Sequence, residues 1–136
     1  DSILEKAKEL GIEKQVAFTG FVPDEDLPGL ISQAQAYILP SLWEGFGIPV
    51  IEAQACGVPV FVSNTSSLPE VAKNSAIQVV PTDINSIAQG IIKTLDAKTR
   101  TDLVRRGFEN IKRFSWEQCA KETIAVLEKV ASNKNP

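Results

Sequence analysis

Histidine and methionine are both absent from this sequence of 136 residues. Without histidine the chain has no His-based metal site, no Ser-His-Asp or Cys-His nucleophile and no imidazole acid–base catalyst of its own. The absence of methionine from a chain that begins at Asp1 leads us to expect a segment of a longer protein. We therefore expect any chemistry at this chain to use carboxylates, hydroxyls and backbone amides.

Positive charge and cysteine are also scarce. The net charge of -3 excludes a basic surface for nucleic acid or an anionic membrane. Cys56 and Cys119 do not form a CxxC pair, so we expect small, buried, reduced thiols, with a bridge between them as the less favoured alternative. The longest apolar stretch, residues 48–62, is interrupted by polar residues and prolines and predicts no transmembrane segment. A cytoplasmic globular protein is the expectation.

Helical and extended patterns alternate along the first 95 residues. Strands are expected at residues 16–19, 36–39, 58–62 and 76–80, and helices at 2–10, 24–34, 49–57 and 83–95. Asp24 and Asp83 are the expected N-caps, and Pro49 suits a first helical position. Strands that alternate with helices pair in parallel, and strands that are apolar on both faces are covered on both sides. We predict an α/β fold, a Rossmann-like parallel sheet of about four strands with helices on both faces.

The pattern after residue 97 is helical to the end of the chain. Ser115 and Gln118 have the spacing of a capping box at the start of the final helix. One stripe of that helix is apolar and is predicted to be a packing face: Cys119, Ala120, Ile124, Leu127 and Val130.

Three loops follow the first three predicted strands, at residues 20–22, 40–47 and 63–67. Ligands of open parallel sheets bind at this edge, where loop amides and helix N-termini converge. The middle loop contains Gly45 and Gly47, which let the backbone approach a ligand closely, next to Glu44. It lacks the third glycine of a dinucleotide fingerprint and the Gly-Lys-Ser/Thr of a P-loop, so both motifs are excluded.

Glu44 and Glu52 lie eight positions apart, one in this loop and one in the helix that follows, so both can face one cleft. Three interpretations are open from the residues alone. Glu44 caps the helix while Glu52 is a surface acid, or the two form a glycosidase-type carboxylate pair, or one acid accepts hydrogen bonds from a ribose. The position at the sheet edge favours a nucleotide ligand.

Residues 40–60, PSLWEGFGIPVIEAQACGVPV, resemble the E-x7-E region of the family 4 retaining glycosyltransferases of the GT-B fold. Residues 64–71 (NTSSLPEV) and 114–117 (FSWE) match the same family, so the similarity covers nearly the whole chain. The resemblance implies that residues 1–136 are part of a C-terminal nucleotide-sugar-binding domain. Its first βα units and the N-terminal acceptor domain would then be absent from this sequence.

The resemblance also implies roles for individual residues. On the sugar and diphosphate side are the catalytic Glu44 and the amides of Gly45, Phe46 and Gly47. On the nucleotide side are Glu52 at the ribose, Ser41, and the base-lining Gly20, Phe21 and Val22. The family often has two glycines where this chain has Ser66 and Ser67, which puts a backbone contact there in question. No metal or other cofactor is implied.

The implied reaction is retaining transfer of a hexose from a UDP- or GDP-linked sugar to a glycan or lipid-linked acceptor, as in polysaccharide biosynthesis. Parts outside this chain would bind the acceptor and could contact the inner face of the membrane. One alternative is a sugar-nucleotide epimerase or phosphorylase of related fold, against which the E-x7-E spacing argues. The other is a non-catalytic α/β nucleotide-binding or interaction module. A receiver domain, for example, would need clustered acids at the first strand and a lysine after the last strand, and this sequence has neither.

No lysine or arginine occurs between Lys14 and Lys73, a stretch that holds six acidic residues and all three candidate loops. A diphosphate site needs cations or many aligned amides. In the family that this sequence resembles, an arginine and a lysine from an earlier strand supply the positive charge. We therefore predict that the 136-residue chain alone is inactive and binds a nucleotide-sugar donor weakly.

Overall fold

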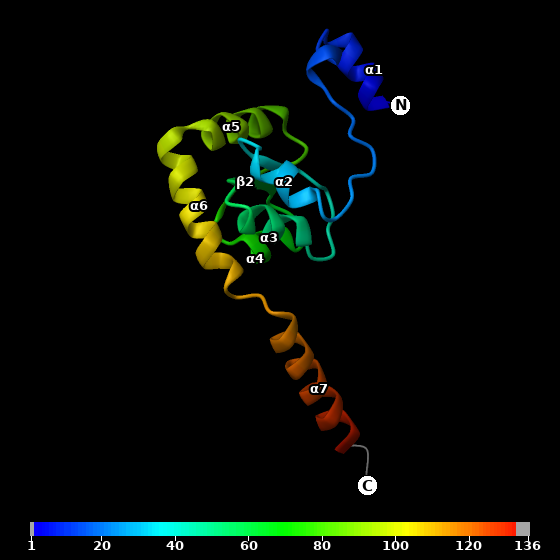
Figure 1. Cartoon of the computed structure of the whole chain (residues 1–136), viewed down its shortest axis with the longest axis vertical. Helices are drawn as coiled ribbons and strands as arrows, with labels where there is room; N and C mark the ends of the chain where they lie inside the picture. The colour runs from blue at the N-terminus through cyan, green and yellow to red at the C-terminus, as the bar shows by residue number, and fades with distance from the viewer. Residues whose placement is uncertain (1, 133–136) are drawn as a thin grey trace.

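Three short parallel strands form the centre of the computed structural model, which describes residues 2–132 (Figure 1). They are β1 (Tyr37–Leu39), β2 (Val60–Ser63) and β3 (Ala76–Val79), in the order β1-β2-β3. Tyr37 is in register with Val60, and Val60 with Ala76. All residues of the middle strand are buried. The predicted parallel α/β fold is confirmed, with one strand fewer than expected.

The strand predicted at residues 16–19 is wrong. This segment is extended but exposed, and it pairs with no strand within residues 2–132. Its apolar side chains Val16 and Phe18 are 36% and 61% exposed. A β-prone sequence becomes a strand only when a neighbour takes its backbone hydrogen bonds, and these residues remain extended without one.

Helices surround the sheet and continue beyond it at both ends (Figure 1). They are α1 (Ser2–Glu9), the 3-10 turn η1 (Glu13–Gln15), α2 (Leu27–Ser32), α3 (Ile48–Ala55), α4 (Leu68–Ala72), α5 (Ile84–Leu95), α6 (Ala97–Ile111) and α7 (Trp116–Ser132). Two of the predicted helix starts are confirmed. Asp83 accepts a hydrogen bond from the Asn85 amide, and Pro49 lies in the first turn of α3.

The predicted N-cap at Asp24 is wrong, because α2 begins three residues later, with Asp26 in the N-cap position. The amides of Asp26 and Leu27 both donate to the Pro23 carbonyl, so Asp24 lies inside a turn that precedes the helix. Helix α4 was not anticipated. Its five residues are too few to show helical periodicity in the sequence.

The two faces of the sheet are covered by different helices. Val60 and Val62 belong to a core that includes Val50 of α3, and Leu68 of α4. Phe61 points to the other face, where a Cβ added to Gly90 of α5 would lie 2.4 Å from its ring. Successive strand residues face opposite sides, so the continuous apolar run of β2 supplies both cores.

A buried polar network joins α3, α4 and α6. The Gln54 side-chain amide donates to the Ser75 hydroxyl at 2.7 Å, and the Asn110 amide donates to the Gln54 carbonyl oxygen at 2.9 Å. Asn110 also donates to the backbone carbonyl of Val71 at 3.0 Å. Every buried side-chain nitrogen and oxygen within residues 2–132 has a hydrogen-bond partner. The network fixes α6 against the helix that carries Glu52.

Helix α7 extends away from the sheet, at the opposite end of the molecule from α1 (Figure 1). No residue of α7 is buried, and Ile124, Leu127 and Val130 are 54%, 63% and 49% exposed. The predicted packing of this stripe is therefore not present within residues 2–132. The Ser115 hydroxyl accepts from the Gln118 amide at 3.3 Å, but the Gln118 side chain donates to Glu122 instead of completing the capping box.

Both cysteines are free thiols, as favoured from the sequence. Their predicted burial is wrong, since Cys56 is half-buried and Cys119 is exposed on α7. None of the helices within residues 2–132 combines the length and the apolar character needed to cross a membrane.

Candidate functional site

The loop of residues 40–47 connects the carboxyl end of β1 to α3 and lies beside the loop that follows β2. Because β1 and β2 are parallel neighbours, both loops leave the sheet at the same edge. Hydroxyl groups of the second loop bond to backbone atoms of the first: Ser63, Thr65, Ser66 and Ser67. The predicted ligand edge therefore forms one hydrogen-bonded unit from two segments about twenty residues apart.

Glu44 is held at both its side chain and its backbone. The Ser41 hydroxyl donates to its carboxylate at 2.8 Å, and the Glu44 amide donates to the Ser66 hydroxyl at 3.1 Å. Glu44 is half-buried as a residue, and its carboxylate makes no ion pair within residues 2–132. Its remaining lone pairs can accept hydrogen bonds from a polar ligand.

The two glycines of the loop have different structural roles. Gly47 is the N-cap of α3 and has φ +95°, and a Cβ there would lie 2.7 Å from Cδ2 of Leu68. Gly45 lacks a positive φ, and a Cβ there would meet nothing within 4 Å. Among the described residues, no hydrogen bond uses the amides of Gly45, Phe46 or Gly47. Three adjacent amides are thus available to an anion or a sugar.

Glu52 lies in the second turn of α3 and is exposed. Its charge reaches Tyr37, the first residue of β1, whose phenol is half-buried. Burial raises the pKa of Tyr37 above its ordinary value, and the charges of Glu52 and then Glu44 raise it further. The charges of both predicted acids thus act on one phenol, which remains protonated at neutral pH.

Tyr37 is the sole tyrosine of the chain and packs against the hydrophobic core. The two acids act on it through their charge, and no hydrogen bond within residues 2–132 joins its hydroxyl to either of them.

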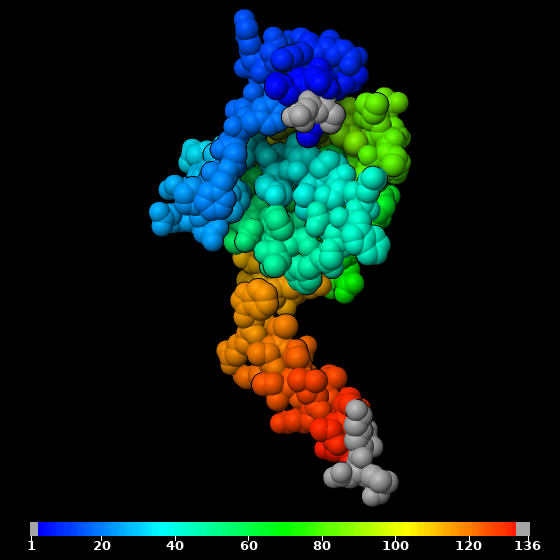
Figure 2. All heavy atoms as spheres, turned by 90° about the vertical axis from the view of Figure 1, so that its right-hand side faces the viewer, coloured from blue at the N-terminus to red at the C-terminus, as the bar shows by residue number. Residues whose placement is uncertain are grey.

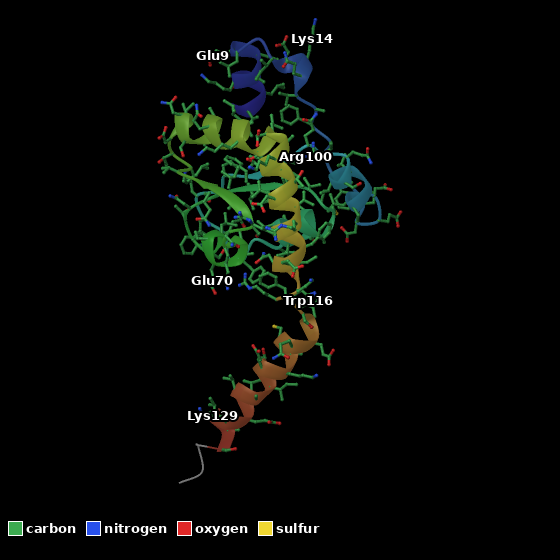
Figure 3. All side chains as sticks on the ribbon, turned by 90° about the vertical axis from the view of Figure 1, so that its left-hand side faces the viewer. Glu9, Lys14, Glu70, Arg100, Trp116 and Lys129 are labelled. Carbon is green, nitrogen blue, oxygen red and sulfur yellow. The ribbon has the colours of Figure 1, made fainter. Side chains whose placement is uncertain are left out.

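The Phe46 side chain packs edge-on against Phe114, with ring centroids 5.6 Å apart. The Arg113 guanidinium lies 4.9 Å from the Phe114 ring centroid and donates to the Asn110 side chain at 2.6 Å. Phe114, part of the 114–117 motif, therefore supports the candidate loop from the turn between α6 and α7. Trp116, from the same motif, is 82% exposed at the start of α7 (Figure 3).

The other predicted site segment, Gly20, Phe21 and Val22, lies in the extended connection from η1 to α2. This connection runs along the outside of the molecule (Figure 2). Phe21 is 88% exposed, and no hydrogen bond within residues 2–132 joins this segment to the loop of residues 40–47. The structure thus holds Ser41 and residues 44–47 in one loop, with Glu52 in the helix that follows it, and does not connect residues 20–22 to them.

The loop of residues 40–47 and its neighbour at 63–67 contain no lysine or arginine, but the structure brings one cation close, because the Arg113 guanidinium lies over the Phe114 ring that packs against Phe46. The ion pairs of the described residues lie on α1, α6 and α7 and include neither Glu44 nor Glu52. Lys14 lies at the N-terminal end of the molecule, beyond the sheet (Figure 3). Within residues 2–132 no three His, Cys, Asp or Glu side chains are grouped closely enough to hold a metal ion.

Comparison with known proteins gives consistent matches. A family model described as "Glycosyl transferases group 1" matches residues 1–110. O-antigen chain mannosyltransferase B of Escherichia coli is 42% identical over 126 residues, which are 91% of this chain and 33% of that protein. MMP alpha-(1->4)-mannosyltransferase of Mycolicibacterium hassiacum is 36% identical over 128 residues, or 89% of this chain and 31% of that protein.

A solved structure has the same fold. Sucrose-phosphate synthase from Thermosynechococcus elongatus superposes with a TM-score of 0.85 and 29% identity, over 97% of this chain and 34% of that one. The chain spans about a third of the length of each of these proteins.

Proposed function

This chain belongs to the group 1 glycosyl transferases, and we propose that it forms the donor site of a retaining glycosyltransferase. The reaction transfers a hexose from a nucleotide-diphosphate sugar to a glycan or lipid-linked acceptor. One observation carries the proposal: at the carboxyl edge of a parallel sheet, three amides without a partner among residues 2–132 adjoin a carboxylate that Ser41 holds in place. The acceptor binds mainly to residues outside this chain.

In this proposal Glu44 orients hydroxyl groups of the transferred sugar. The amides of Gly45, Phe46 and Gly47 contact the sugar and stabilise charge on the leaving diphosphate. Such donors act without reorganising when they are held before the reaction starts, and the loop is held by hydroxyls from Ser63 to Ser67. The acceptor hydroxyl attacks from the face that the diphosphate leaves. This mechanism needs no histidine, metal ion or covalent nucleophile from the chain.

Glu52 accepts hydrogen bonds from the ribose hydroxyls, and its exposure supports contact with a ligand. Ser41 borders the nucleotide. The resemblance also assigns Gly20, Phe21 and Val22 to the base, although no hydrogen bond within residues 2–132 joins them to the loop of residues 40–47. The names of the two curated relatives, both mannosyltransferases, support mannose as the sugar. The nucleotide of the proposed donor is GDP or UDP. The proposal includes a cytoplasmic location for this domain. The cations that neutralise the diphosphate come from outside the stretch between Lys14 and Lys73.

The test uses the natural full-length protein that contains this chain, with GDP-mannose and other GDP- and UDP-sugars as donors. We expect Glu44→Ala to lower kcat more than it raises the donor KM. We expect Glu52→Ala mainly to raise the donor KM, because a charge-assisted hydrogen bond contributes about 1.5–3 kcal/mol, or about 10- to 150-fold. Glu109→Ala, an exposed change on α6, is the matched control.

Product analysis separates the proposed reaction from its alternatives. Glycosyl transfer releases a nucleoside diphosphate and extends the acceptor. An epimerase would change the sugar but leave it attached to the nucleotide. A non-catalytic interaction module would leave both the donor and the acceptor unchanged. Wild-type kcat in the Glu44→Ala enzyme would remove Glu44 from the site.

A further inference from the structure

We propose that Ser66 and Ser67 are positioning residues, which turn the amides of Gly45 and Gly47 toward the bound donor. This inference rests on the proposed function and deepens it. The sequence by itself gives neither serine a role.

The two hydroxyls hold the backbone of the loop at successive points. The Ser66 hydroxyl accepts from the Glu44 amide at 3.1 Å and donates to the Glu44 carbonyl oxygen at 2.5 Å. The Ser67 hydroxyl lies 3.0 Å from the same carbonyl oxygen and 2.9 Å from that of Phe46. Its single proton is shared between these two acceptors. The Glu44 carbonyl, which precedes Gly45, and the Phe46 carbonyl, which precedes Gly47, therefore both point toward Ser66 and Ser67.

Peptide geometry sets the direction of the amides that follow. In a trans peptide the C=O of one residue and the N–H of the next point in opposite directions, and no cis peptide occurs in the described residues. Because the Glu44 carbonyl points at the two serines, the Gly45 N–H points away from them. The Phe46 carbonyl likewise directs the Gly47 N–H to that outer side. Two amides thus face the same direction, and both are without a partner among residues 2–132.

The backbone of Ser66 supports a specific role for its hydroxyl. Its φ of +59° lies in the left-handed region, where a side chain is disfavoured and glycine is not. A residue that only closed the turn would be better as glycine. Here the seryl hydroxyl makes two hydrogen bonds to Glu44, which compensate for the unfavourable conformation.

Adjacent hydroxyls extend the same arrangement toward β1. Thr65 donates to the Leu42 carbonyl at 3.2 Å, and Ser63 donates to the Ser41 carbonyl at 2.5 Å. Ser41 in turn donates to the Glu44 carboxylate. The hydroxyls of residues 63–67 therefore hold the backbone of the loop that carries the proposed diphosphate-binding amides. Through Ser41 they also help to position the Glu44 carboxylate, which is proposed to bind the sugar. Charge that develops on the leaving diphosphate then meets donors already in position, so their alignment affects kcat more than donor binding.

The test compares Ser66→Gly, Ser67→Ala and the double variant in the full-length enzyme, with kcat, donor KM and Tm measured for each. Glycine suits the φ of residue 66, so folding is retained. We expect the double variant to lower kcat about tenfold, with donor KM within about twofold and Tm within about 3 °C. Ser67→Thr keeps the hydroxyl at a φ of -78° and restores kcat. Thr101→Ala, which removes a hydroxyl-to-carbonyl bond on α6, is the control.

Two results would overturn the assignment. One is wild-type kcat in the double variant while Glu44→Ala is impaired, which leaves the proposed function intact. The other is a loss of kcat that follows a fall in Tm and is not restored by Ser67→Thr, since that would make the serines structural only. Absence of any transfer by the wild-type enzyme, or full activity of Glu44→Ala, would instead contradict the proposed function itself.

Discussion

Replacement of Gly47 by alanine tests the geometry of the candidate loop most directly. Gly47 has φ +95° and caps α3, and its carbonyl accepts from the Val50 amide at 2.9 Å. A left-handed conformation costs a non-glycine residue about 1–2 kcal/mol. The added Cβ would also lie 2.7 Å from Cδ2 of the fully buried Leu68. Overpacking of this kind costs about 1–3 kcal/mol, and the end of a leucine can move, which favours the lower part of that range.

Together these effects predict that Gly47→Ala lowers the free energy of unfolding by about 2–4 kcal/mol. For a chain of this length that corresponds to a fall in Tm of about 6–20 °C. Gly45→Ala is the matched control two residues earlier in the same loop, because its Cβ would enter open space and its φ is not positive. We expect Gly45→Ala to change stability by less than about 0.5 kcal/mol.

Urea unfolding followed by circular dichroism measures both variants. The same pair also reports on function in the full-length enzyme. The new methyl group of Gly45→Ala would occupy space next to an amide proposed to meet the donor, so its donor KM should rise while its Tm does not change. Equal stability of the two variants would refute the argument from φ and from the Leu68 contact.

Two further predictions concern the core and the acidic surroundings of β1. Gly90→Ala should destabilise the protein by about 1–2 kcal/mol, because its Cβ would lie 2.4 Å from the Phe61 ring and overpacking exceeds the gain in helix propensity. Gly29→Ala, whose Cβ would enter open space in α2, should instead raise the free energy of unfolding by up to about 1 kcal/mol in the same urea experiment. If Gly90→Ala and Gly29→Ala changed the free energy of unfolding in the same direction, the packing argument would be contradicted. A pH titration followed by phenolate absorbance should show a raised pKa for Tyr37, the sole tyrosine of the chain. Glu52→Gln should lower this pKa, because it removes a nearby negative charge. An unchanged titration midpoint in Glu52→Gln would show that the Glu52 charge does not act on Tyr37. Since the folded state holds this proton more tightly than the unfolded state, the stability of the fold should decrease as the pH rises through the ordinary pKa of tyrosine.

The sequence alone determined the fold class and the order of most elements, and it predicted where the candidate site lies. Alternation of apolar runs with capped helical segments is a local property, so β1, β2, β3 and α5 could be predicted near their observed bounds. Parallel pairing then places the loops after β1 and β2 at one edge, which is how Glu44 and the glycines of residues 45 and 47 could be identified. The sequence motif around Glu44 and Glu52 also indicated the family that the comparisons show.

Tertiary structure decided the contacts between segments distant in the chain. That the hydroxyls of Ser66 and Ser67 hold Glu44 and Phe46, and that the charges of both acids act on Tyr37, depends on strand register and on the path of each loop. The same holds for the segment at 16–19, which has the residues of a strand but no neighbouring strand among residues 2–132. Strand pairing and apolar packing each need a second segment, which supplies the hydrogen-bond partners or the apolar surface. The residue pattern of one segment does not show whether that second segment lies beside it.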